Sequence, residues 1–124
     1  MKYKVIKKEG RVFVRDTDAT GRVFCPRPIE WVIQAFEEIC YEKAHKKENV
    51  AIVKASVDYF VPCFWFDPYT LVLQIDRVGN RSFDLKADII KGSRAIEVLI
   101  TFVVEGSAAD FLGLFWGHER DEIV

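Results

Sequence analysis

The spacing of apolar residues predicts one long helix followed by several strands. Between residues 28 and 47, apolar positions recur at intervals of three and four, which is the period of an amphipathic helix. Pro28 suits the first turn, where a helix leaves its amides unpaired and proline has none to lose. Basic residues within 43–47 mark the predicted C-terminal end. The apolar positions are Ile29, Val32, Ile33, Phe36, Ile39 and Cys40.

Alternation of apolar and polar residues predicts a strand at 10–15 and four more at 50–61, 69–78, 82–90 and 94–105. The turns VGNRS and KGS separate the last three runs and contain hairpin signals, so we expect antiparallel neighbours. The last run is apolar on both faces, which indicates an interior strand. The predicted order is a strand, a long helix and a four-stranded meander, and the sheet must curl around the single helix.

The length of 124 residues suits one domain spanning 1–124, with a core at about 10–105 and an apolar tail at 106–124. A terminal segment with so much apolar surface is expected to pack on the sheet or to join a subunit interface. The apolar residues of the tail are Phe111, Leu112, Leu114, Phe115 and Trp116.

Composition excludes several classes of protein. The 18 basic and 19 acidic residues give a net charge of −1, which lacks the positive footprint of a nucleic-acid-binding protein. No apolar run is long enough to span a membrane and no apolar leader is visible at residues 1–10, so we expect a soluble cytoplasmic protein. The cysteines show no CxxC spacing and are expected to be reduced, with Cys40 and Cys63 as small core residues. Together with two histidines, they provide no metal-ligand spacing.

The connection RDTDATGRVFCPRP, residues 15–28, holds the candidate chemistry. On the residues alone, Asp16 and Asp18 favour a pair of turn-forming side chains. A nucleophilic Cys25 would need an adjacent base. Of the two histidines, His45 lies at the far end of the predicted helix and His118 in the tail, so a Cys–His dyad is disfavoured.

Three features together resemble the hotdog-fold acyl-CoA thioesterases, in the group that includes 4-hydroxybenzoyl-CoA thioesterase and the thioesterases associated with the Tol–Pal system. The first is a D-x-x-G-x-V pattern with an aromatic residue after it, at Asp18, Gly21, Val23 and Trp31. The second is A-x-x-x-Y-x-x-P, a following aspartate and R-V-G-x-x-S. The third is the order of the elements. The positions of the second feature are Ala55, Tyr59, Pro62, Asp67, Arg77, Val78, Gly79 and Ser82.

The resemblance implies an α+β hotdog fold, in which a curved five-stranded antiparallel sheet wraps a long central helix. It also implies a homodimer or homotetramer with an acyl thioester site between subunits. Asp18 then becomes the catalytic carboxylate, as base or nucleophile, and Asp16 a structural residue or cap. The backbone N–H of Cys25 would polarise the thioester carbonyl, a role that suits the unpaired amides at a helix start. No cofactor is implied beyond the CoA part of the substrate.

The resemblance also suggests binding residues. Bulky side chains around the predicted site favour an aromatic or medium-chain acyl group. Basic side chains near the R-V-G turn are candidates for CoA: solvated surface is the favoured interpretation of each one alone, and contact with CoA is expected from the group. The acyl-binding candidates are Gly21, Phe24, Trp31, Tyr59, Phe64, Trp65 and Phe66, with Phe13 beside them. The CoA-binding candidates are Arg77, Arg81, Ser82 and Lys91, with Lys86 and Arg94 nearby.

Four positions depart from the family pattern. Arg27 and Pro28 replace an asparagine and an aromatic residue, Ile33 replaces an acidic residue, and Phe66 replaces a small residue that is often glycine. Two functions therefore stay open: an acyl-CoA or acyl carrier protein thioester hydrolase, and a non-catalytic hotdog module that binds acyl thioesters or acts as a scaffold or regulator. A hotdog dehydratase is a third, disfavoured option, because its histidine motif is not visible.

Overall fold

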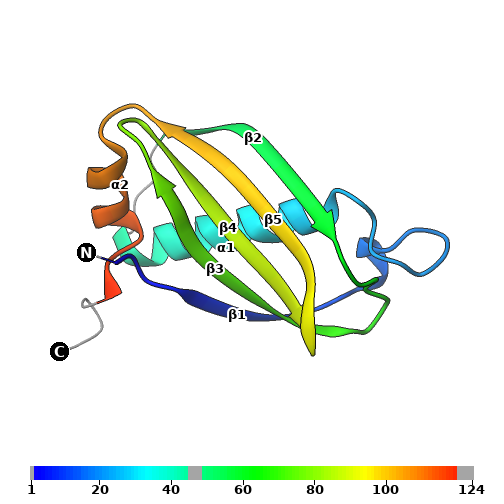
Figure 1. Cartoon of the computed structure of the whole chain (residues 1–124). Helices are drawn as coiled ribbons and strands as arrows, with labels where there is room; N and C mark the ends of the chain where they lie inside the picture. Colours follow the sequence, from blue (N-terminus) through cyan, green and yellow to red (C-terminus); the bar gives the residue numbers. More distant parts are fainter. Residues whose placement is uncertain (1, 45–48, 120–124) are drawn as a thin grey trace.

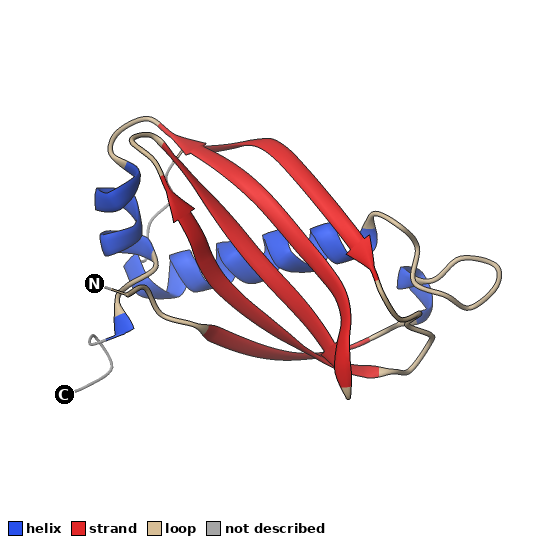
Figure 2. Cartoon of the chain, in the orientation of Figure 1, coloured by secondary structure: helices blue, strands red, loops and turns tan. Residues whose placement is uncertain are grey.

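The computed structural model describes residues 2–44 and 49–119, which form one curved antiparallel sheet and the helices beside it. The strands are β1 (Ile6–Arg11), β2 (Val50–Tyr59), β3 (Pro68–Val78), β4 (Ser82–Lys91) and β5 (Ser93–Val104). The helices are α1 (Arg27–Ala44) and α2 (Ala108–Phe115), with a 3₁₀ turn at Val14–Asp16. The sheet wraps α1 along its length (Figure 1), and both helices lie on one side of it (Figure 2). The α+β hotdog fold is therefore confirmed.

The strand predicted at 10–15 is wrong, because the strand is β1 and it ends at Arg11. Val12 leaves the sheet fully buried, with its N–H donating to the Asp67 carbonyl at 2.9 Å. The chain then turns into the 3₁₀ segment, which leaves Val14 exposed instead of continuing the alternation. β1 itself has the polar sequence IKKEGR, which carries no apolar period.

The predicted meander is correct for β3, β4 and β5 and wrong for β2. The spatial order is β1-β3-β4-β5-β2, so β2 pairs with β5 rather than with β3. The cause is α1, which carries the chain across the concave face from one edge of the sheet to the other. β5 is interior, as its two apolar faces predict.

The core lies between α1 and the concave face of the sheet. Phe36 of α1 stacks on Phe102 of β5 with ring centroids 4.5 Å apart. The predicted apolar faces of β3 and β4 are buried, except for Ile75 of β3, which is half-buried. The helix follows its predicted period, while the basic residues expected at 45–47 lie outside the described residues. Its buried side chains are Pro28, Val32, Ala35, Phe36, Ile39 and Cys40.

The apolar tail packs within the chain. It forms α2, which contacts α1 and β5 and buries most of its apolar side chains. Trp116 is buried behind it and donates its indole N–H to the Lys4 carbonyl at 2.9 Å. Within the part of the chain that the structure describes, no helix is long and apolar enough to cross a bilayer.

Candidate active site

A small hairpin presents Asp18 at one end of the molecule. The Asp18 N–H donates to the Arg22 carbonyl at 2.8 Å, and the Gly21 N–H returns to the Asp18 carbonyl at 3.1 Å. Gly21 has φ +82°, a left-handed conformation that glycine adopts without steric cost. The hairpin is fastened to the segment 61–67 by two backbone bonds, Val23 N–H to Cys63 O and Trp65 N–H to Gly21 O.

The Asp18 side chain is exposed and ionised. Its Oδ1 accepts bonds from the Thr20 hydroxyl at 2.6 Å and the Thr20 N–H at 2.8 Å. These bonds, the hydroxyl's first, hold the pKa of Asp18 below its ordinary value of 3.8. Asp18 is therefore a turn-forming residue, as the residues alone predict. The same turn keeps its carboxylate charged and exposed to solvent.

Asp16 has the opposite environment, because its side chain is only 5 % exposed. Its Oδ2 accepts the Phe13 N–H at 2.9 Å and its Oδ1 accepts the Trp31 indole N–H at 3.3 Å. The Arg27 Nε lies 3.9 Å from the same Oδ1. Burial, together with the negative charge of Asp16, raises the pKa of Tyr69 to about 12. Asp16 thus ties the 3₁₀ turn to the start of α1.

The connection into α1 leaves the N–H of Cys25 available. The Phe24 N–H donates to the Asp16 carbonyl at 2.7 Å, and the Arg27 N–H donates to the Phe24 carbonyl at 2.9 Å. Pro26 and Pro28 have no N–H. No acceptor among the described residues pairs with the N–H of Cys25. The sequence CPRP therefore leaves this single donor beside the Asp18 hairpin.

Tyr59 braces that donor from the last residue of β2. Its hydroxyl donates to the Cys25 carbonyl, so it restrains the residue whose N–H is open. Desolvation, followed by this bond, raises the pKa of Tyr59. The family resemblance placed Tyr59 among the acyl-binding candidates. No local pattern linked it to Cys25, which lies 34 positions earlier in the chain.

A partly buried ion pair between Lys91 and Asp67 holds the segment 61–67 in place. The Lys91 ammonium contacts Asp67 Oδ2 at 2.8 Å and the Pro62 carbonyl at 3.0 Å. The same Oδ2 accepts the Phe64 N–H at 2.8 Å. Lys91, through its hydrogen bond, lowers the pKa of Asp67. The sequence analysis did not predict this pair, because Lys91 was a CoA-binding candidate and Asp67 was only a position of the family motif.

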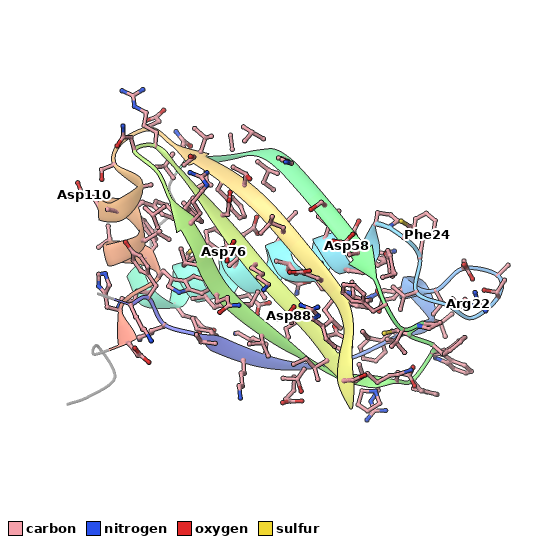
Figure 3. The ribbon with its side chains drawn as sticks, viewed as in Figure 1. Arg22, Phe24, Asp58, Asp76, Asp88 and Asp110 are labelled. Carbon is pink, nitrogen blue, oxygen red and sulfur yellow. The ribbon has the colours of Figure 1, made fainter. Side chains whose placement is uncertain are left out.

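The aromatic candidates separate into two groups. Exposed rings surround the Asp18 hairpin, and Figure 3 shows Phe24 and Arg22 at this end of the molecule. Trp31 lies instead under the 3₁₀ turn, stacked on Tyr69 at 4.6 Å. The exposed candidates at this end are Phe13, Phe24, Tyr59, Phe64, Trp65 and Phe66.

Phe66 adopts a backbone conformation that favours glycine. Its φ is +71°, in the left-handed region where side chains cost about 1–2 kcal/mol. The conformation is held by the Phe66 N–H donating to Val12 O at 2.8 Å and by the Arg11 guanidinium donating to Phe66 O at 2.7 Å. The family pattern, in which this position is often glycine, therefore agrees with the backbone conformation of Phe66.

Most of the CoA candidates lie at the opposite end of the sheet. Arg77 and Ser82 flank the β3–β4 hairpin, where Arg77 contacts Asp84 at 2.9 Å and the Ser82 hydroxyl at 3.1 Å, and Arg81 is exposed in the turn. β3 has 11 residues, so at about 3.3 Å per residue its ends are roughly 30 Å apart. One chain therefore does not bring Arg77, Arg81 and Ser82 to Asp18 (Figure 1). Of the basic candidates, Lys91 and Arg94 lie at the Asp18 end, in the hairpin between β4 and β5.

An apolar groove of about 450 Å³ runs between α1 and the β2 edge. Ile33 and Phe36 line its α1 side, and Val50 and Ile52 line its β2 side. Glu37 is the one acidic residue in its wall. The remaining lining residues are Cys40, Tyr41, Phe102, Phe111 and Phe115.

The sequence profile of the Thioesterase superfamily matches residues 21–98. The chain belongs to this superfamily. Solved structures agree on its fold: a gentisyl-coenzyme A thioesterase has a TM-score of 0.76 and 24% identity over 91% of this chain and 100% of its own. A 1,4-dihydroxy-2-naphthoyl-CoA thioesterase from Synechocystis has a TM-score of 0.73 and 20% identity over 81% of each chain. A Staphylococcus aureus protein solved in complex with CoA has a TM-score of 0.72 and 11% identity, over 83% of this chain and 71% of its own. No curated protein sequence matches this thioesterase-superfamily chain.

Proposed function

We propose that the protein hydrolyses acyl thioesters, with Asp18 as the carboxylate and the Cys25 N–H as the oxyanion donor. The observation that carries the proposal is that an ionised, exposed Asp18 and the unpaired N–H of Cys25 lie on the same connection into α1. Asp18 either attacks the thioester carbon or activates a water that does so. The developing oxyanion is stabilised by the Cys25 N–H, a type of donor worth about 10²–10³ in kcat.

A second copy of the chain would complete the site. β2 is an edge strand of 10 residues that exposes Ile52 and Val53, and such edges pair readily with another chain. β2 runs from Val50 at the α2 end to Tyr59 at the Asp18 end. Antiparallel pairing of two β2 strands would therefore carry the Asp18 hairpin of one copy to the end of the other copy that holds Arg77, Arg81 and Ser82.

The same pairing would place the apolar groove beside the second copy's Cys25, since Val50 and Ile52 line that groove. A lining of aliphatic and aromatic side chains suits an aromatic or medium-chain acyl group. Two structural neighbours are named for aromatic acyl-CoA esters, which supports this choice.

The test is a panel of short-chain, octanoyl, palmitoyl and benzoyl CoA esters, assayed for thiol release with the wild type and Asp18→Asn. We expect turnover by the wild type on at least one apolar ester and none above background by the variant. Wild-type rates in Asp18→Asn would remove the catalytic assignment. Light scattering at micromolar concentration is expected to give a dimer or tetramer, and Val53→Glu on the β2 edge should shift it toward monomer.

The non-catalytic module remains the second candidate. It is favoured by Arg27, which departs from the asparagine of the family pattern and whose guanidinium contacts Glu30 at 2.6 Å and approaches Asp16. A rise in melting temperature with octanoyl-CoA, without thiol release from any ester in the panel, would support this function instead.

A further inference from the structure

Four exposed apolar side chains form a patch at the Asp18 end of the molecule. Phe13, Val14, Trp65 and Phe66 are 50, 62, 51 and 55 % exposed, and we call them the aromatic tip. They surround an open hollow of about 470 Å³ whose remaining wall is Arg15. The three rings alone expose roughly 300 Å². Exposed apolar area of this size marks an interaction surface.

The conformation of the tip indicates that binding, rather than folding, accounts for Phe66. Glycine would take the φ of +71° without strain, yet the chain has a phenyl ring there that is more than half exposed. The ring stacks on Trp65 at 4.5 Å, so the two rings present one continuous surface. Strained residues of this kind are typical of functional surfaces.

The tip is joined directly to the proposed catalytic hairpin. The Trp65 N–H donates to Gly21 O, and the Gly21 N–H donates to Asp18 O, both at 3.1 Å. The tip follows β1 and precedes β3, which pair with each other, whereas β2 is the opposite edge of the sheet. A dimer formed through β2 would therefore leave both tips exposed and beside their own Asp18.

The charge around the tip is positive. The Arg15 guanidinium lies 5.8 Å from the Phe13 ring centre, and Arg11 borders Phe66. Two of the neighbouring acids are neutralised, since Asp16 is buried near Arg27 and Asp67 is paired with Lys91. Asp18 stays charged, but it lies on the hairpin and does not line the hollow of the tip. The surface therefore complements a partner that is apolar and acidic.

We propose that the aromatic tip docks an acidic acyl carrier protein, which presents the acyl group as a thioester on its pantetheine arm. This inference rests on the proposed function and names the carrier. Water adds its hydroxyl to the acyl carbon at Asp18, the C–S bond breaks, and the pantetheine sulfur leaves as a thiol. Rings and arginines are the residues enriched in the cores of protein interfaces.

Other occupants fit less well. A second copy docked tip to tip would face Arg15 with Arg15, because symmetric contacts use the same patch twice. In a β2-paired dimer the two tips point to opposite ends, so one bilayer surface would not reach both. Free CoA is disfavoured as an occupant, because the hollow is open and offers no narrow slot for the flat base of the nucleotide.

The test compares an octanoyl carrier protein of fatty-acid synthesis with octanoyl-CoA as substrates of the full chain. Arg15→Glu and Val14→Glu change the tip at two positions that are not among the proposed catalytic or acyl-binding residues. We expect kcat/KM for the carrier-protein substrate to fall at least tenfold in both, while kcat/KM for octanoyl-CoA stays within twofold. Lys7→Glu and Val5→Glu are matched controls, since Val5 is 55 % exposed near the other end of β1, and both should behave as wild type.

Binding is measured separately, by anisotropy of a fluorescent carrier protein bearing a non-hydrolysable octanoyl amide. Tip-dependent binding without hydrolysis of either substrate would leave the docking inference standing and remove the proposed function. Hydrolysis of octanoyl-CoA with no carrier binding, or with equal binding by Arg15→Glu, would overturn the docking inference alone. Parallel losses on both substrates would also overturn it, because they would place CoA on the tip.

Discussion

Asp16 and Asp18 lie two residues apart in one loop, and their environments predict opposite consequences of the same substitution. In Asp16→Asn, the amide nitrogen must replace one carboxylate oxygen. Phe13 donates to one oxygen and Trp31 to the other, so either orientation of the amide leaves one N–H facing another donor. In Asp18→Asn, the side chain stays in solvent and keeps one oxygen for Thr20.

The magnitude follows from burial. An unsatisfied buried donor costs about 1–3 kcal/mol, so Asp16→Asn should lower the free energy of unfolding by about 2 kcal/mol. For a domain of this size, that corresponds to a fall in Tm of roughly 8 °C. Asp18→Asn should change the free energy of unfolding by less than about 0.5 kcal/mol, as exposed substitutions do. It should nevertheless abolish thiol release.

The assay is thermal unfolding by circular dichroism for both variants and the wild type, with thiol release from the best CoA ester measured at 20 °C. The reasoning would be refuted if Asp16→Asn melted with the wild type, or if the two variants lost equal stability. In either case, burial of Asp16 would not be what holds the 3₁₀ turn to α1.

Three further predictions follow from the site. Tyr59→Phe should lower kcat several-fold at unchanged KM and cost only about 1 kcal/mol of stability, because it frees the Cys25 carbonyl; steady-state kinetics and denaturant unfolding check both. Phe66→Gly should be more stable than Phe66→Ala by about 1 kcal/mol, the reverse of the usual order, because only glycine relieves the positive φ; equal urea midpoints would contradict the strain. Since its hydrogen bonds lower the pKa of Asp18 below 3.8, the carboxylate stays charged as pH falls toward 4 and protonates only below that; kcat/KM should therefore show no acid limb near 6.5, where a histidine base would produce one.

Local periodicity determined much of the architecture from the sequence alone. The period of α1 identifies its buried face, and alternation identifies the inner faces of β3 and β4, because those patterns are repeated over many neighbouring residues. The D-x-x-G spacing likewise located the turn that follows Asp18, since Gly21 takes the left-handed conformation that this short turn requires. Each of these features depends on residues close together in the chain.

Only the tertiary structure decided which distant segments meet. β1 has no apolar period and exists because its backbone pairs with β3, about 60 residues later. The position of β2 depends on where α1 delivers the chain. Three features of the site also depend on contacts between distant segments. They are the hydrogen bond from Tyr59 to Cys25, the ion pair of Lys91 and Asp67, and the burial of Asp16 but not of Asp18. Such contacts leave no periodic signal, because the two partners are brought together only when the sheet closes around the helix.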